Sequence, residues 1–221
     1  MRVYRFLSIL LVSLLLLTFF SALPVHASPS WNVQNVDVNG ANQGSNGYCP
    51  IVVDSNNTSH IVYTDTSIGN PNNYIWYEIP SVMYASWTSS GWSTQKIAGG
   101  DAFSLVLDAN GNPHVLYGIP LGALYYASWT GTNWASQIVD PNNTGFGSLA
   151  LDSAGNPHVA YTDGTTVKYA SWTGSNWNIQ TVDTSSEEIP FSLSLALDQN
   201  NTPYIMYGYK ANYMDNSTGI N

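Results

Sequence analysis

The chain has 221 residues, of which only 9% are charged and 13% are aromatic, whereas roughly 25% of residues are charged in a typical soluble domain. This composition excludes a disordered tail, a coiled coil or a protein of long helices, which are rich in Glu and Lys. Both arginines lie at positions 2 and 5, so the later chain sets three lysines against all 14 acidic residues, a formal charge of −11. Because nucleic-acid binding needs Lys and Arg to neutralise phosphates, we expect no nucleic-acid partner.

Residues 1–27 are typical of an export signal. A basic start (Met1–Arg5) precedes an apolar run from Phe6 to Leu23, and Val25-His26-Ala27 fits a signal-peptidase site. The run is 18 residues long, the lower limit for spanning a bilayer, so an uncleaved membrane anchor is the alternative. We expect a secreted or cell-surface protein whose single domain covers residues 28–221.

A repeat organises the rest of the chain. One copy reads Ser104-Leu-Val-Leu-Asp108-Ala-Asn-Gly-Asn-Pro-His114-Val-Leu-Tyr117, and the next reads Ser148-Leu-Ala-Leu-Asp152-Ser-Ala-Gly-Asn-Pro-His158-Val-Ala-Tyr161. The marker aspartates of successive copies are separated by 54, 44 and 46 residues; they are Asp54, Asp108, Asp152 and Asp198. Within a copy, short runs rich in Val, Ile, Tyr and Trp alternate with Asn-Gly, Gly-Asn-Pro and Thr-Gly turns, which is typical of strands. Four short antiparallel strands in every 40-odd residues predict the blades of a β-propeller.

We therefore expect an all-β protein with four blades of four antiparallel strands, at about 48–98, 103–140, 147–183 and 192–221. Residues 31–37 (Trp-Asn-Val-Gln-Asn-Val-Asp) match residues 177–183, the fourth strand of a blade. They are expected to complete the last blade and close the ring, which would leave no open sheet edge. The alternative is a piece of a larger propeller. The long first interval places a loop insertion at roughly Gly69 to Pro80.

The repeat resembles that of secreted bacterial and archaeal propeller proteins with a Leu-x-Leu-Asp-x-x-Gly-x-Pro-His-x-x-Tyr unit, grouped loosely with sialidase-like (Asp-box) and lectin-type propellers. The resemblance covers nearly the whole chain after the signal and implies the architecture. The Asp-box pattern, Ser-x-Asp-x-Gly-x-x-Trp, is matched only loosely, because Asp152 is followed by Ser-Ala-Gly155-Asn-Pro-His158. In these families, sialidases hold a substrate carboxylate with three arginines, and fucose-binding propeller lectins use one arginine in each pocket. The later chain has no arginine, so neither chemistry fits it.

Aromatic residues are the main candidates for a ligand site, because aromatic rings can stack on the C–H surfaces of sugars. Three Trp pairs flank a Thr-Gly or Ser-Gly turn, where packing between blades is the competing interpretation. Three less regular aromatics lie in the insertion, and an insertion in a regular array commonly carries function. Two aspartates that follow Tyr-Thr in alternate blades are candidates for the paired carboxylates of a glycosidase. The predicted ligand-binding residues are Tyr74, Trp76, Tyr77, Trp87, Trp129, Trp172, Asp65 and Asp163.

The repeated aspartates and histidines are predicted to be structural. His60, His114 and His158 share one repeat position on three different blades, so they do not converge as the ligands of one zinc ion must. The marker aspartates are expected to accept backbone N–H groups in turns. Asp108, Asn110 and Asn112 alternate like the first half of a calcium loop but lack its downstream Glu. No cofactor is therefore expected, and calcium at these three residues is the alternative.

These features predict an exported, non-catalytic β-propeller that binds carbohydrate or a cell-surface protein. Its strong negative charge favours neutral glycans over anionic ones. A structural or adhesion repeat of a surface protein is the first alternative. A glycoside hydrolase or polysaccharide lyase on the same scaffold is the second.

Overall fold

The computed structural model describes residues 34–36, 48–66, 79–120, 122–142, 145–185 and 189–210. The predicted export signal, residues 69–78 of the predicted insertion and most of the predicted closing strand lie outside these ranges. The chain divides into two units, Met1–Asn35 and Val36–Asn221, and every strand belongs to the second. Within the described ranges, no helix is long and apolar enough to cross a membrane.

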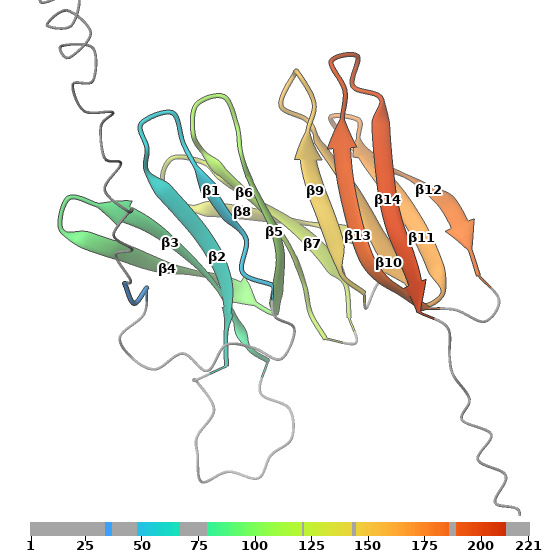
Figure 1. Cartoon of the computed structure of the whole chain (residues 1–221), viewed down its shortest axis with the longest axis horizontal. Coiled ribbons are helices and arrows are strands. Elements are labelled where there is room, and N and C mark those ends of the chain that lie inside the picture. Colours follow the sequence, from blue (N-terminus) through green and yellow to red (C-terminus); the bar gives the residue numbers. More distant parts are fainter. Residues whose placement is uncertain are drawn as a thin grey trace, which may run out of the picture. The chain divides into compact units, whose positions relative to one another are not determined.

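The described chain is all-β, as predicted, and forms four successive antiparallel sheets with neighbouring strands paired in chain order (Figure 1). In the described residues, the first three sheets have four strands each and the fourth has two. Sheet 1 contains β1 (Ile51–Val53), β2 (Ser59–Asp65), β3 (Ser81–Thr88) and β4 (Gly91–Gly99), and sheet 2 contains β5 (Asp101–Leu107), β6 (Pro113–Gly118), β7 (Leu124–Trp129) and β8 (Trp134–Asp140). Sheet 3 contains β9 (Gly147–Leu151), β10 (Pro157–Asp163), β11 (Thr166–Trp172) and β12 (Trp177–Thr184), and sheet 4 contains β13 (Ile189–Leu197) and β14 (Pro203–Lys210).

The marker aspartates fix the turn between the first two strands of each sheet, as the sequence predicted. Asp108 Oδ1 accepts the backbone N–H groups of Asn110 and Asn112, both at 2.8 Å. The third residue after each aspartate has a positive φ: +80° at Gly111 and +83° at Gly155, and close to +60° at the equivalent asparagines. Glycine adopts a positive φ at low cost, and Asn adopts it more readily than most other residues. The four turns therefore place Gly or Asn at this position, namely Asn57, Gly111, Gly155 and Asn201.

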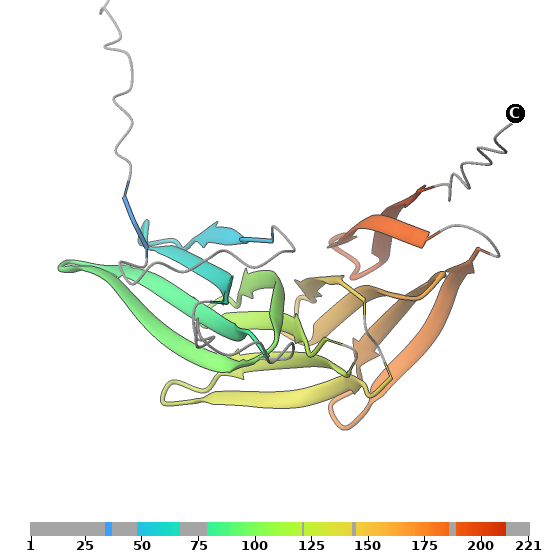
Figure 2. The same ribbon diagram turned by 90° about the horizontal axis from the view of Figure 1, so that it is seen from below.

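Successive sheets pack face to face, so that the first strands of each inner sheet are covered on both sides (Figure 2), while the last strands, β8 and β12, stay largely exposed. We call the face that packs on the preceding sheet the leading face and the face that packs on the following sheet the trailing face. Between sheets 2 and 3, Val106 and Leu116 on the trailing face meet Leu149 and Val159 on the leading face. The same repeat positions meet at the other two junctions: Val52 and Val62 with Leu105 and Val115, and Ala150 and Ala160 with Leu195 and Ile205.

The predicted closing strand is described only at residues 34–36, which are not assigned to a strand. Val36 packs against the cluster of buried residues in sheet 1 that contains Ile61 and Ala85. In the repeat alignment it corresponds to Val139, which packs in the same way against Val159 and Ala170 of sheet 3. Val36 thus occupies the place that a fourth strand takes beside the leading face of the next sheet. Its pairing with the last sheet lies outside the described residues and stays a prediction.

Candidate functional site

In each tryptophan pair the second ring is partly buried and packs between sheets, whereas the first ring lies beside it and is also accessible. The second ring of each pair contributes to the packing between sheets. Trp134 meets Tyr84 of the preceding sheet at a centroid distance of 5.3 Å, and Trp177 meets Tyr126 at 5.9 Å, both edge to face. The first rings lie on the outer side of the second, at centroid distances of 5.4 to 5.6 Å; they are Trp87, Trp129 and Trp172. Packing therefore accounts for the second ring of each pair and leaves the first ring partly exposed.

A short hairpin fixes Trp172 opposite Trp177. The two residues are cross-strand partners at the ends of β11 and β12. In the connecting loop, Asn176 donates its backbone N–H to Thr173 Oγ1 at 3.2 Å, and the Thr173 hydroxyl donates to the Asn176 carbonyl at 2.9 Å. Trp129 and Trp134 are paired in the same way in sheet 2. The hairpin therefore holds an indole ring at a defined place on the edge of sheets 2 and 3.

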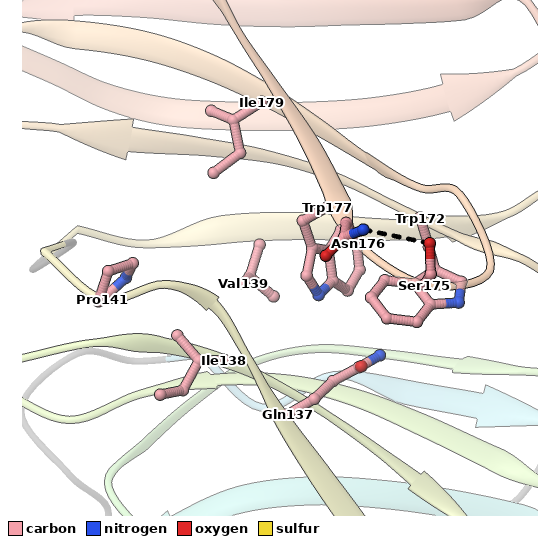
Figure 3. Close-up of a pocket in the computed structure, with 9 residues that line it drawn as sticks. All are labelled: Gln137, Ile138, Val139, Pro141, Trp172, Ser175, Asn176, Trp177 and Ile179. Carbon is pink, nitrogen blue, oxygen red and sulfur yellow. Dashed lines mark hydrogen bonds between the residues drawn. The ribbon is translucent and has the colours of Figure 1, made fainter.

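A pocket of about 400 Å³ lies between sheet 2 and the β11–β12 hairpin of sheet 3 (Figure 3). Gln137, Ile138 and Val139 of β8 form one side, while Trp172 and Trp177 belong to the opposite side. The complete lining is Gln137, Ile138, Val139, Pro141, Trp172, Ser175, Asn176, Trp177 and Ile179.

The lining combines apolar surface with uncharged polar groups. Ile138 and Ile179 are 48% and 40% exposed, and they flank the indole rings as apolar walls. Asn176 Nδ2 donates to Ser175 Oγ at 3.1 Å, which orders the polar end of the hairpin (Figure 3). None of the nine lining residues is charged. Such a site suits a small uncharged ligand that has both an apolar face and hydroxyl groups.

Of the predicted ligand-binding residues, only Trp172 belongs to this pocket. Trp129 and Trp87 occupy the equivalent hairpins of sheets 2 and 1, and Trp87 is 39% exposed. The three insertion aromatics, Tyr74, Trp76 and Tyr77, lie outside the described residues. Gln137 and Asn176 were not singled out from the sequence, although the repeated Gln at 95, 137 and 180 was a visible signal.

The predicted carboxylate pair, Asp65 and Asp163, lies on the first and third sheets. Asp65 is buried at the end of β2. Asp163 forms an ion pair with Lys168, whose Nζ also lies 3.3 Å from Asp140 Oδ2. Lys168 therefore neutralises Asp163, and neither predicted aspartate lines the pocket.

Asp140 connects sheet 2 to sheet 3. Tyr161, which is fully buried, donates its hydroxyl to Asp140 Oδ2 at 2.9 Å. Burial acts to raise the pKa of Asp140, but the Asn142 N–H and the Tyr161 hydroxyl, together with Lys168, hold that pKa below its usual value. The next junction repeats this contact, because Tyr207 donates to Asp183 Oδ2 at 2.9 Å.

The repeated histidines form a structural Asp–His–Tyr chain in the first three sheets. His60 Nδ1 lies 2.6 Å from the Tyr84 hydroxyl, and its Nε2 lies 3.5 Å from Asp54 Oδ2. This geometry favours the tautomer in which Nε2 carries the proton and Nδ1 accepts from the tyrosine. Burial lowers the pKa of His114, the equivalent residue of sheet 2, which favours its neutral form. The other two chains are Asp108–His114–Tyr126 and Asp152–His158–Tyr169.

Asp108, Asn110 and Asn112, the alternative calcium residues, form a hydrogen-bonded turn. Both Asp108 oxygens accept hydrogen bonds, since Oδ2 takes the Asn112 side-chain amide at 2.9 Å in addition to the backbone bonds at Oδ1. Asp152 makes the same three bonds, with Ala154 in the place of Asn110. The side chain at that place is thus not needed for the turn. Within the residues that the structure describes, no group of three His, Cys, Asp or Glu side chains could hold a metal ion.

Comparison with protein-family models gave no match, and neither did comparison with curated proteins. Among solved structures, the chain is similar to a fucose lectin from Kordia zhangzhouensis in complex with methyl-fucoside. The identity is 18%, the TM-score is 0.42, and the alignment covers 62% of this chain and all of that one. The repeated antiparallel sheets of this chain define an all-β protein made of propeller blades.

Proposed function

We propose that this chain is a carbohydrate-binding propeller module that takes a neutral sugar in the pocket between β8 and the β11–β12 hairpin. The observation that carries the proposal is the partly exposed indole of Trp172 in a pocket that also contains Gln137, Asn176 and Ser175 and no charged residue.

The chemistry of this lining fits a sugar better than a purely apolar ligand. One face of a pyranose ring presents C–H groups that can stack on an indole, and Ile138 and Ile179 extend that apolar surface. The amides of Gln137 and Asn176 each provide donors and an acceptor, which matches the hydroxyl groups of a sugar. The lack of a lining lysine or arginine leaves the carboxylate of an acidic sugar without a partner.

The turn and junction aspartates support binding rather than glycosidic chemistry. Burial raises the pKa of Asp101, but Asp101 does not line the pocket. A general acid for glycoside hydrolysis needs a raised pKa, whereas hydrogen bonds lower the pKa of the turn and junction aspartates. In Asp54 and Asp198 the largest cause is a backbone N–H, from Thr58 and Thr202, and in Asp183 it is the Tyr207 hydroxyl. These groups are ionised near neutral pH, and they are committed to turns and sheet contacts.

Export is part of the proposal. The basic and apolar segment at residues 1–27 supports secretion or cell-surface display, where neutral glycans or surface proteins are available as partners. The excess of acidic residues supports discrimination against polyanions by repulsion.

The test is thermal unfolding of the full chain with a panel of neutral and acidic sugars, methyl fucoside included. A sugar at 100 times its dissociation constant should stabilise the protein by about 2.7 kcal/mol. Trp172→Ala should abolish that stabilisation, because it removes the stacking surface of the pocket.

Trp129→Ala is the matched control, since it removes the same residue type from the equivalent hairpin of sheet 2. It should leave the stabilisation by the sugar intact. Equal loss in both variants would contradict the assigned pocket, and the absence of a shift with every sugar would contradict glycan binding.

A structural or adhesion repeat is the second candidate. The observation in its favour is the exposed apolar side chains on the outermost sheets, including Ile51 and Met206. A surface of this kind indicates contact with another protein rather than with a sugar.

A further inference from the structure

The three sheet junctions of this chain are built from the same repeat positions. The eighth residue after each marker aspartate lies on the trailing face, and in sheets 1 to 3 this residue is fully buried: Val62, Leu116 and Ala160 are each 0% exposed. The third residue before the marker lies on the leading face and is also buried where a sheet precedes it, as in Leu105, Leu149 and Leu195. Each junction thus joins one trailing face to one leading face.

The leading face of sheet 1 and the trailing face of sheet 4 carry apolar residues at the same two repeat positions, but these residues are exposed. Met206 is the eighth residue after Asp198, but it is 75% exposed on the trailing face of sheet 4. Ile51 is the third residue before Asp54, but it is 61% exposed on the leading face of sheet 1. Met206 and Ile51 therefore occupy junction positions at the two ends of the array and are uncovered, whereas Ile61 on the same leading face as Ile51 is only 8% exposed and has Val36 beside it.

A polar contact of the junctions is also available on sheet 4. Ser104 Oγ accepts the backbone N–H of Leu149 at 3.2 Å, and Ser148 Oγ accepts that of Leu195 at 3.1 Å. Ser194 occupies the same repeat position on sheet 4 and is exposed. The trailing face of sheet 4 thus carries both the apolar residue of the inner junctions and the hydroxyl that two of those three junctions use.

We infer that these two faces form a junction between two copies of this chain, in which sheet 4 of one copy packs on sheet 1 of the other. A second copy presents both faces, so a twofold pair forms two identical junctions and leaves neither face exposed. The chain's own faces match each other by repeat position, and Met206 and Ile51 are both exposed in the single chain. The occupant that best fits each face is therefore the opposite face of another copy.

The test is the mass of the full chain in solution, measured by light scattering during size-exclusion chromatography. We expect a dimer, and we expect Met206→Glu and Ile51→Glu each to give monomers, because either change places a carboxylate in both junctions. Ile179→Glu is the matched control: it changes an isoleucine that is 40% exposed but belongs to the pocket, and it should stay dimeric.

Mixing the two monomeric variants provides a test that misfolding cannot imitate. A mixed pair has one junction with both substitutions and one junction with neither, so an equimolar mixture should form a dimer that neither variant forms alone. A monomeric wild-type chain would overturn the inference, and so would a mixture that stays monomeric. An assembly that keeps growing with concentration would overturn the closed twofold pair. Sugar binding at the pocket is a separate property, so a monomer that still binds sugar would refute this inference alone.

Discussion

The hydrogen bond between Tyr161 and Asp140 allows a quantitative prediction about the junction of sheets 2 and 3. Tyr161→Phe removes a hydroxyl that is fully buried and donates to a carboxylate of which only 5% is exposed. A hydrogen bond to a charged group contributes about 1.5 to 3 kcal/mol. Asp140 keeps the Asn142 N–H at 3.0 Å and Lys168 at 3.3 Å, so we expect a loss of about 2 kcal/mol in the free energy of unfolding at pH 7.

The loss should depend on pH in one direction. Because the pKa of Asp140 is lowered in the folded protein, its ionised form stabilises the fold above the unfolded-state pKa of about 3.9. That stability disappears as the pH falls through the lower folded-state pKa. Tyr161→Phe brings the folded-state pKa closer to the unfolded value, so the difference between variant and wild type should shrink below about pH 4.

Urea unfolding at pH 7 and at pH 3 is the assay. Tyr207→Phe is the matched control at the same repeat position, and we expect a smaller loss there, because Asp183 also accepts the Tyr209 hydroxyl at 3.1 Å. An unchanged stability of Tyr161→Phe at pH 7, or a loss of equal size at both pH values, would refute the reasoning.

Three further predictions concern the repeat. Gly155→Ala should lower the unfolding free energy by about 1 kcal/mol, because φ is +83° and the space around the glycine is open, so that the backbone alone causes the loss. Gly155→Asn should cost less, because Asn201 has a similar positive φ; equal losses of the two variants in chemical denaturation would contradict this. Leu116→Ala should cost about 2 to 5 kcal/mol, since Leu116 is fully buried between sheets 2 and 3, and a loss below 1 kcal/mol would mean that these sheets do not pack as described. Burial lowers the pKa of His114 from its usual 6.5, so the unfolded chain binds the proton first and the unfolding free energy should fall as the pH drops below about 6.5. His114→Phe should make the melting temperature less dependent on pH in this range, and an unchanged pH dependence would contradict the role given to burial.

Much of the fold could be predicted from the sequence because the residues that determine turns and strands recur in each copy of the repeat. The marker aspartates, the Gly or Asn three residues later and the alternation of short apolar runs all recur at fixed positions, so strand order and turn type followed directly. The exposure of Met206 and Ile51 did not follow, because both match residues that are buried in neighbouring copies. Their surroundings depend on which sheet comes next, and that information is absent from the local pattern.

The candidate site was predictable only in part for the same reason. Aromatic stacking identified Trp172, but the sequence left packing between blades as the competing interpretation for both rings of each pair, and only the structure separated them. Gln137 and Ile138 come from the neighbouring sheet, 35 and 34 residues before Trp172 in the sequence. Only the packing of sheet 2 on sheet 3 brings them opposite the indole. Asp65 and Asp163 were predicted as a pair from their equivalent positions, but Lys168 holds Asp163 within sheet 3.

The most direct test of the central claim follows the tryptophan indole N–H signals of the ¹⁵N-labelled chain by NMR while a neutral sugar is added. The signals are assigned with single Trp→Phe variants. If the pocket between β8 and the β11–β12 hairpin binds the sugar, the Trp172 signal should shift in a saturable manner, while the signals of Trp87 and Trp129 stay in place. Saturable shifts of Trp87 or Trp129 with a constant Trp172 signal, or no saturable shift with any neutral sugar, would contradict the account.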